Sequence, residues 1–251
     1  ADITPGDLQY CFFTNGGAEA VEMALKLARI ATGGRWYIST VGAFHGKSMG
    51  AISMGGKDTY RVPYTPMVQQ VQHVEYGNAE DMRKAIINLQ AVGEKVAAVI
   101  IEPIQGEAGV IVPPEGYLTK VREICDETGV ALIFDEVQTG FGLTGKFWAS
   151  DYYVKPDIIA FGKKAQVCGI MVSDRIDDID DNVFKVSSRI NSTWGADLTD
   201  MVRSKFILDV IKNENLVENA NKVGEHLKYQ LGLIQNEFPT YINNVRGLGL
   251  M

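Results

Sequence analysis

Polar side chains stand where three apolar runs of this chain end. The runs, each with the polar residue that comes after it, are 96–101 with Glu102, 131–134 with Asp135, and 158–161 with Lys163 after Gly162. Burying a carboxylate beside such a run is costly unless it meets a hydrogen-bond donor or a positive charge. A lysine in a partly apolar place is shifted towards the neutral amine, which attacks carbonyl groups. These residue types therefore predict acid–base and amine–carbonyl chemistry.

Each of these residues also has a plainer interpretation. Asp135 could face a protonated ring nitrogen of a cofactor, or it could be a capping or magnesium-binding acid of the kind found in many α/β proteins. Glu102 could support a neighbouring site residue or accept backbone N–H groups at the end of a strand. Lys163 and Lys164 could be solvated lysines of a loop, because lysine is rarely buried. No single residue decides between these interpretations.

A glycine-rich turn precedes a predicted helix near the start of the chain. Gly16 and Gly17 let the backbone approach a ligand, and the free N–H groups and dipole of a helix N-terminus favour an anion such as phosphate. The alternative is an ordinary turn and helix cap. With Asp135 for a ring nitrogen and Lys163 for an imine, the turn completes the set that a pyridoxal phosphate enzyme needs. A nucleotide-binding protein is disfavoured, because the turn lacks the G-x-G-x-x-G spacing and a P-loop lysine.

Alternating strands and helices must position these residues. The short, continuous apolar runs are typical of strands covered on both faces. Between them, apolar residues recur at three- and four-residue spacing over 79–89 and 118–125, which predicts helices. This order indicates an α/β fold with a parallel sheet, whose ligands bind beyond the carboxyl ends of the strands. After Asp197 we expect a long helical stretch that breaks near 213–215 and leaves the sheet domain.

Composition excludes several classes of protein. The 251 residues are 46% hydrophobic and 22% charged, which is the balance of a globular protein rather than of a disordered chain. A net charge of −7 without a basic stripe disfavours nucleic acid and membrane partners and favours small molecules. No apolar run approaches the ~20 residues of a membrane span. Three widely spaced cysteines indicate reduced, mostly buried thiols and a cytoplasmic location.

Over nearly its whole length the chain resembles the class III, or ω-amino group, aminotransferases. The motifs that carry the resemblance, in the family's order, are TNGGAEA (14–20), AFHGKS (43–48), IEPIQGE (101–107), FDEVQTG (134–140), PDI (156–158), GK (162–163) and STWG (192–195). The resemblance implies fold type I of the pyridoxal phosphate-dependent transferases: an α/β large domain at 1–198 with a mostly parallel, seven-stranded sheet covered by helices. Residues 199–251 would form the interdomain helix and the beginning of a C-terminal α+β small domain.

The resemblance also implies roles for individual residues. Lys163 would hold pyridoxal 5'-phosphate as an imine, and Asp135 would pair with its ring nitrogen. Glu107 resembles a switching glutamate, which pairs with an arginine expected beyond Met251 and moves aside for the α-carboxylate of 2-oxoglutarate. The other residues expected at the cofactor are Gly17 and Ala18 at the phosphate, Phe44 and Val137 on the ring faces, Gln138 near the ring hydroxyl, Thr193 at the phosphate of the neighbouring subunit, and His45, which could equally be structural.

Two halves of the chain resemble different subfamilies. The motifs at 43–48 and 73–78 are similar to putrescine and related diamine aminotransferases, whereas those at 161–169 and 189–195 are similar to L-lysine 6-aminotransferases. We expect a homodimer with shared active sites that moves the terminal amino group of a lysine-like amino acid to 2-oxoglutarate, giving a semialdehyde and glutamate. The alternatives are a putrescine/diamine or ornithine-type aminotransferase, and a truncated, non-catalytic remnant that binds the cofactor.

Two features depart from the family's pattern. Ala196 and Asp197 stand where the family usually has Gly-Asn, which adds a methyl group and a negative charge close to the expected phosphate region. This change is expected to affect cofactor affinity or dimer packing. Both ends of the chain read as internal to a longer protein, so we expect the N-terminal segment and the C-terminal domain that close over the substrate in the family to lie outside it.

Overall fold

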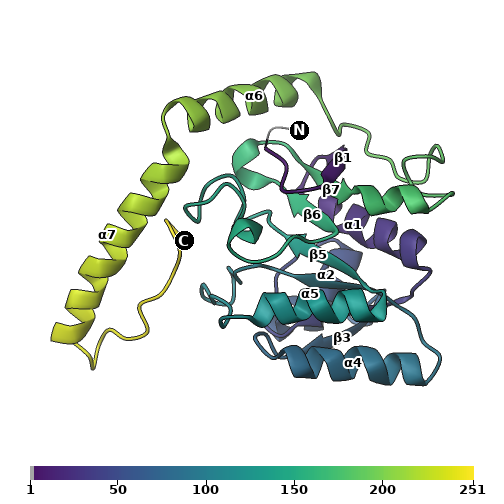
Figure 1. Ribbon diagram of the computed structural model, residues 1–251, viewed down its shortest axis with the longest axis horizontal. Helices are drawn as coiled ribbons and strands as arrows, with labels where there is room; N and C mark the ends of the chain where they lie inside the picture. The colour runs from purple at the N-terminus through teal and green to yellow at the C-terminus, as the bar shows by residue number, and fades with distance from the viewer. Residues whose placement is uncertain (1–2) are drawn as a thin grey trace.

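The apolar runs predicted as strands form the centre of a seven-stranded sheet with helices on both faces (Figure 1). The computed structural model describes residues 3–251. The strands are β1 (Leu8–Thr14), β2 (Trp36–Thr40), β3 (Gln70–Val74), β4 (Val96–Ile101), β5 (Ala131–Asp135), β6 (Ile158–Phe161) and β7 (Cys168–Ser173). The α-helices are α1 (Gly17–Thr32), α2 (Met49–Met54), α3 (Asp58–Arg61), α4 (Ala79–Ala91), α5 (Tyr117–Thr128), α6 (Leu198–Asn213) and α7 (Leu216–Glu237). The short 3₁₀ helices are η1 (Val62–Tyr64), η2 (Ala149–Tyr152), η3 (Lys163–Ala165) and η4 (Asp174–Asp178).

The sheet is mostly parallel, as the resemblance implies. In the strand order β1-β7-β6-β5-β4-β2-β3, only β7 runs against its neighbours, pairing antiparallel with both β1 and β6. Ile101 at the end of β4 lies opposite Phe134 of β5, and Asp135 lies opposite Ala160 of β6. The carboxyl ends of these three central strands therefore meet at one edge of the sheet.

Alternate residues of the central strands pack into separate cores on the two faces of the sheet. In β4, Val99 and Ile101 belong to the core covered by α4 and α5, whereas Ala98 and Ile100 belong to the core covered by α1 and α2. Every residue of β4 is buried, as expected for a strand covered on both faces. The predicted doubly covered α/β sheet is thus confirmed.

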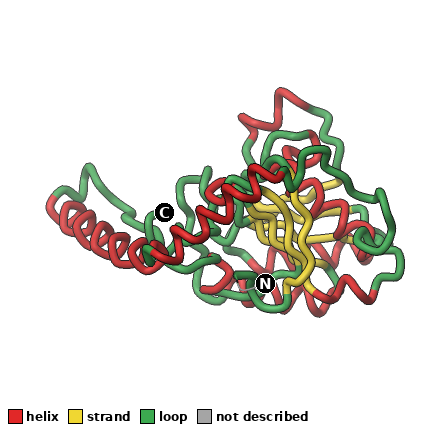
Figure 2. Tube along the Cα trace, turned by 90° about the horizontal axis from the view of Figure 1, so that it is seen from above, coloured by secondary structure: helices red, strands yellow, loops and turns green. Residues whose placement is uncertain are grey.

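Helices α6 and α7 carry the chain away from the sheet, as Figures 1 and 2 show. The Asp197 carboxylate caps α6, because it accepts hydrogen bonds from the N–H groups of Thr199 at 2.9 Å and Asp200 at 3.4 Å. Asn215 has a left-handed conformation with φ of 52° between the two helices, which is the predicted break. The predicted boundary between 198 and 199 falls at the start of α6, and the division into two domains stays a prediction.

The cysteines are less buried than the sequence predicts. All three are free, but only Cys125 is buried, since Cys11 is exposed on edge strand β1 and Cys168 is half-buried. The expectation of mostly buried thiols is therefore wrong for Cys11. Within residues 3–251, no helix combines the length and apolar character needed to cross a bilayer.

Candidate active site

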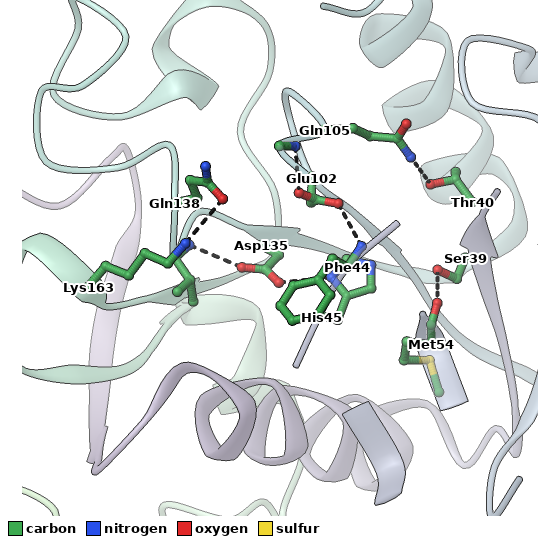
Figure 3. Close-up of polar contacts among 12 residues, drawn as sticks. Ser39, Thr40, Phe44, His45, Met54, Glu102, Gln105, Asp135, Gln138 and Lys163 are labelled. Carbon is green, nitrogen blue, oxygen red and sulfur yellow. Dashed lines mark hydrogen bonds and ion pairs between the residues drawn. The ribbon is translucent and has the colours of Figure 1, made fainter. Parts of the chain in front are cut away.

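A cavity of about 290 Å³ lies where β4, β5 and β6 end and α1 begins. This is the edge at which open α/β sheets bind their ligands. Most of the predicted site residues line it: Gly17, Ala18, Phe44, His45, Asp135, Val137, Gln138 and Lys163. Residues that are far apart in the chain thus meet at one place, which Figure 3 shows in part.

Asp135, the last residue of β5, points into this cavity and is only 6% exposed. One carboxylate oxygen lies 2.8 Å from Nδ1 of the buried His45, and the other accepts the N–H of Val137 at 3.1 Å. The remaining ring nitrogen of His45, Nε2, is buried without a partner among residues 3–251. His45 and the Val137 N–H together supply the donors that a buried carboxylate at this position requires.

The side chains of the adjacent residues Lys163 and Lys164 have different partners. Lys163 donates from Nζ to Oε1 of Gln138 at 3.1 Å, and its amino group also points towards Asp135 (Figure 3). Lys164 instead donates to the backbone carbonyl of Gln138, and burial, together with the charge of Lys163, lowers the pKa of Lys164 to about 8. Lys163 has φ of 54°, a strained conformation for a side chain with Cβ that is typical of functional sites. Of the two lysines, Lys163 lines the cavity.

The N-terminus of α1 forms one wall of the cavity. Gly16 precedes α1 without a side-chain cap, so the first N–H groups of the helix are open to a ligand. A Cβ placed on Gly17 would lie 2.9 Å from Cγ1 of Val137, which shows how closely the turn packs against the loop after β5. Free N–H groups and a helix dipole at this wall suit an anion.

Glu102 comes directly after β4 and lies between the loop that carries Phe44 and the loop that carries Gly106. It is 5% exposed, and its two oxygens accept the N–H of Phe44 at 2.9 Å and the N–H of Gly106 at 3.0 Å. Burial is the largest effect on Glu102 and raises its pKa to about 6, and the negative charge of Asp135 adds to this rise. His45 and the two backbone N–H groups act in the opposite direction and partly offset it. Glu102 is thus both an acceptor of backbone N–H groups and a residue of the cavity wall.

Two predicted site residues do not line the cavity. Glu107 and Thr193 are both exposed, and no ion pair joins Glu107 to another residue within 3–251. Arg246 instead donates to the backbone carbonyls of Gly109 and Val110, in the same loop as Glu107. The roles expected of Glu107 and Thr193 require an arginine beyond Met251 and a neighbouring subunit, so both roles stay predictions.

Other residues of the cavity were not predicted from the sequence. Gly46 and Thr139 line it, and so does Cys168, which the sequence analysis does not place in the site. A Cβ on Gly46 would lie 2.6 Å from Cβ of Ala18, and φ of Gly46 is 118°, so only glycine suits this position. The sequence does contain a pattern that could identify this residue, because Gly46 lies between His45 and Lys47 in the AFHGKS motif at 43–48.

The carboxylates of Asp135 and Glu136, adjacent in sequence, point in different directions. Glu136 is fully buried and accepts the N–H groups of Ala149 at 2.7 Å and Ser150 at 2.8 Å and the hydroxyl of Thr139 at 2.8 Å. Successive residues at a strand end point to opposite faces, which separates the two acids. Glu136 therefore holds the loop at 149–150, while Asp135 faces the cavity.

Comparisons with known proteins identify the family. Residues 1–251 match the family described as Aminotransferase class-III. The chain belongs to the class III aminotransferases. A lysine aminotransferase from M. tuberculosis in its internal aldimine form is 40% identical, with a TM-score of 0.91 over 98% of this chain and 62% of that one.

Two further solved relatives are an amine transaminase from an uncultivated Pseudomonas species in its PLP-bound form, at 29% identity and a TM-score of 0.88, and the ornithine aminotransferase from Toxoplasma gondii, at 28% and 0.85. Each alignment covers 97% of this chain, and 61% and 58% of the respective relative. This class III chain therefore spans about three fifths of the length of the relatives it matches.

Class III aminotransferases depend on pyridoxal phosphate, and the residues of the cavity fit that group. Lys163 offers an amine, Asp135 a buried carboxylate for a ring nitrogen, and the uncapped N-terminus of α1 a site for phosphate. Asp197, whose charge the sequence analysis places near the phosphate region, is turned to cap α6. Ala196, which replaces the family's glycine, has φ of 62°, a conformation that favours glycine.

Proposed function

We propose that this class III aminotransferase moves the terminal amino group of a lysine-like basic amino acid to 2-oxoglutarate, giving a semialdehyde and glutamate. The observation that carries the proposal is the convergence of Lys163, Asp135 and the N-terminus of α1 on one cavity. Lysine is favoured as the donor because a lysine aminotransferase is 40% identical to this chain, whereas an ornithine aminotransferase is 28% identical.

The residues that line the cavity have different roles in the proposed reaction. When bound, pyridoxal phosphate supplies an aldehyde that captures amines and a ring that withdraws electrons from the reacting carbon. Asp135, oriented by His45 and the Val137 N–H, holds a positive charge on the ring nitrogen. The Lys163 amine acts as the general base that takes a proton from the carbon bearing the amino group. The N-terminus of α1 binds the phosphate and so fixes the orientation of the ring.

We also infer a cytoplasmic homodimer in which Thr193 of one subunit reaches the phosphate bound by the other. The exposure of Thr193 supports this arrangement. So does the neighbouring Trp194, because its large apolar side chain is 70% exposed in one subunit and a partner subunit would cover it. Sedimentation velocity tests the inference, and a monomer in the presence of pyridoxal phosphate would contradict it.

The lysine assignment is tested by spectroscopy. We expect the protein reconstituted with pyridoxal phosphate to show a visible absorption band that borohydride removes. Lys163→Ala should abolish this band, whereas Lys164→Ala, the matched control on the adjacent residue, should retain it. A band that persists in the Lys163 variant would refute the assignment.

The donor is tested by measuring glutamate formed from 2-oxoglutarate with lysine, ornithine and putrescine. We expect the highest kcat/KM with lysine. A higher kcat/KM with putrescine would assign the protein to the diamine aminotransferases, and no glutamate from any of the three amines would refute the proposed reaction.

A further inference from the structure

Glu102 is a buried carboxylate at the cavity for which the proposed reaction has no task. Asp135 already serves the ring nitrogen, and Lys163 already serves as the base. A second buried acid beside Asp135 is unfavourable in itself, because burial and the neighbouring negative charge both oppose its ionisation. Glu102 lies between two loops of the cavity and hydrogen-bonds to the backbone of each.

One oxygen of Glu102 holds the loop that follows β2. It accepts the backbone N–H of Phe44 at 2.9 Å, across 58 residues of sequence. The Phe44 ring, expected on one face of the cofactor, packs edge-on against Tyr60 at 5.4 Å between centroids. His45 comes next in the chain and contacts Asp135. Fixing the backbone of Phe44 therefore restrains the ring-facing side chain and the partner of Asp135 together.

The other oxygen of Glu102 holds the loop that follows β4. It accepts the N–H of Gly106 at 3.0 Å. A Cβ on Gly106 would lie 2.6 Å from Oε1 of Gln138, so the Gly106 backbone packs directly against that amide. The same Oε1 of Gln138 accepts the amino group of Lys163 at 3.1 Å. Through Gly106, Glu102 thus supports the residue that orients Lys163.

We propose that Glu102 is a positioning residue whose two oxygens join the Phe44 loop to the Gly106 loop, so that the ring-facing side chain and the Lys163 amine keep a fixed separation. The inference rests on the proposed function. Gln105 joins the same two loops at a second point, because its Nε2 donates to Oγ1 of Thr40 at 3.1 Å (Figure 3). The same Nε2 donates to the carbonyl of Val41 at 2.9 Å. Through Glu102 and Gln105 the loop after β4 therefore holds the loop after β2 in place, and these two connections are called the clamp below.

Protonation of Glu102 should weaken this clamp. An ionised carboxylate accepts both N–H groups, whereas the acid form turns one oxygen into an O–H donor. Burial raises the pKa of Glu102 to about 6, and the titratable groups that face it are the Asp135 carboxylate and the His45 imidazole. The environment of a bound cofactor should therefore change near this pH, and the change should disappear in a variant that cannot titrate at 102.

The test compares Glu102→Gln and Glu102→Asp with wild type after reconstitution with pyridoxal phosphate. The amide can accept only one of the two N–H groups, and the shorter aspartate keeps the charge but cannot reach both loops. Loss of one hydrogen bond to a charged acceptor predicts a rise of about tenfold or more in the dissociation constant of pyridoxal phosphate in each variant. Glu136→Gln, a matched change at a buried acid outside the cavity, should leave that constant within about twofold.

The circular dichroism of the visible band supplies a second readout. We expect it to weaken in both Glu102 variants, and its change near pH 6 in wild type to be absent from Glu102→Gln. Wild-type affinity and dichroism in both variants, with a normal Lys163-dependent band in wild type, would overturn the positioning role and leave the proposed function standing. Wild-type behaviour of Glu102→Asp alone would overturn positioning in favour of a purely electrostatic role. A wild-type protein without that band would overturn both proposals.

Discussion

Replacing Glu102 by Gln should change how the free energy of unfolding depends on pH, even without cofactor. Glu102 is 5% exposed, and burial raises its pKa from the ordinary 4.5 to about 6. An acid with a higher pKa in the folded than in the unfolded protein stabilises the fold while it is protonated. This contribution is lost as the pH rises through the two pKa values. The amide variant does not titrate at this position, so a comparison of the two proteins isolates the effect.

The magnitude follows from the difference between the two pKa values. Going from 4.5 to about 6 corresponds to about 2 kcal/mol, at ~1.4 kcal/mol for each pH unit. Wild type should therefore lose about 2 kcal/mol relative to Glu102→Gln as the pH rises through this window. The hydrogen bond that the amide cannot make changes the absolute stability of the variant. The slope with pH, rather than the offset, therefore tests the reasoning.

Urea unfolding followed by far-ultraviolet circular dichroism measures this slope. Both proteins, free of pyridoxal phosphate, would be unfolded at a series of pH values from below 4.5 to above 6. Every other side chain is the same in the two proteins, so the comparison isolates position 102. Parallel curves, or a wild type that gains stability relative to the variant with rising pH, would refute the assignment of a raised pKa to Glu102.

Two further predictions concern the packing of the cavity and the fold. Gly46→Ala should displace Ala18, because its Cβ would lie 2.6 Å from that of Ala18, and pyridoxal phosphate should bind at least about tenfold more weakly in a titration. Gly33→Ala, which also has positive φ but open space around it, should bind normally, and equal effects of the two would contradict this explanation. Glu136→Ala leaves three donors, including the N–H groups of Ala149 and Ser150, without their acceptor, and should lower the free energy of unfolding by about 3 kcal/mol in urea. A loss below about 1 kcal/mol would show that water replaces the carboxylate.

The positions of Asp135 and Lys163 could be predicted from the sequence. Each follows a short apolar run bounded by charged, Gly or Pro residues, and such runs are typical of strands covered on both faces. Parallel strands bring their carboxyl ends to one edge of the sheet, so an acid and a lysine after two neighbouring strands must lie near each other. The structure confirms the strands and places both side chains at one cavity.

The partners of these residues could not be predicted in the same way. Nothing in the local pattern distinguishes Asp135 from Glu136, yet the first contacts His45 and the second holds the loop at 149–150. Periodicity describes the faces of one element, whereas these contacts depend on how loops from different elements meet. Glu107 and Thr193 show the same limit, since both are exposed and do not line the cavity, and the roles that the resemblance implies for them stay predictions.

The kinds of chemical group were determined by the sequence alone: an amine, a buried acid and a glycine-rich turn before a helix, in the order of one enzyme family. The tertiary structure alone decided which polar groups touch, because hydrogen bonds such as those of Glu102 to Phe44 and of His45 to Asp135 span 58 and 90 residues. Local residue types specify strands, helices and turns through short-range interactions. The geometry of a site depends on the packing that brings distant segments within hydrogen-bonding distance.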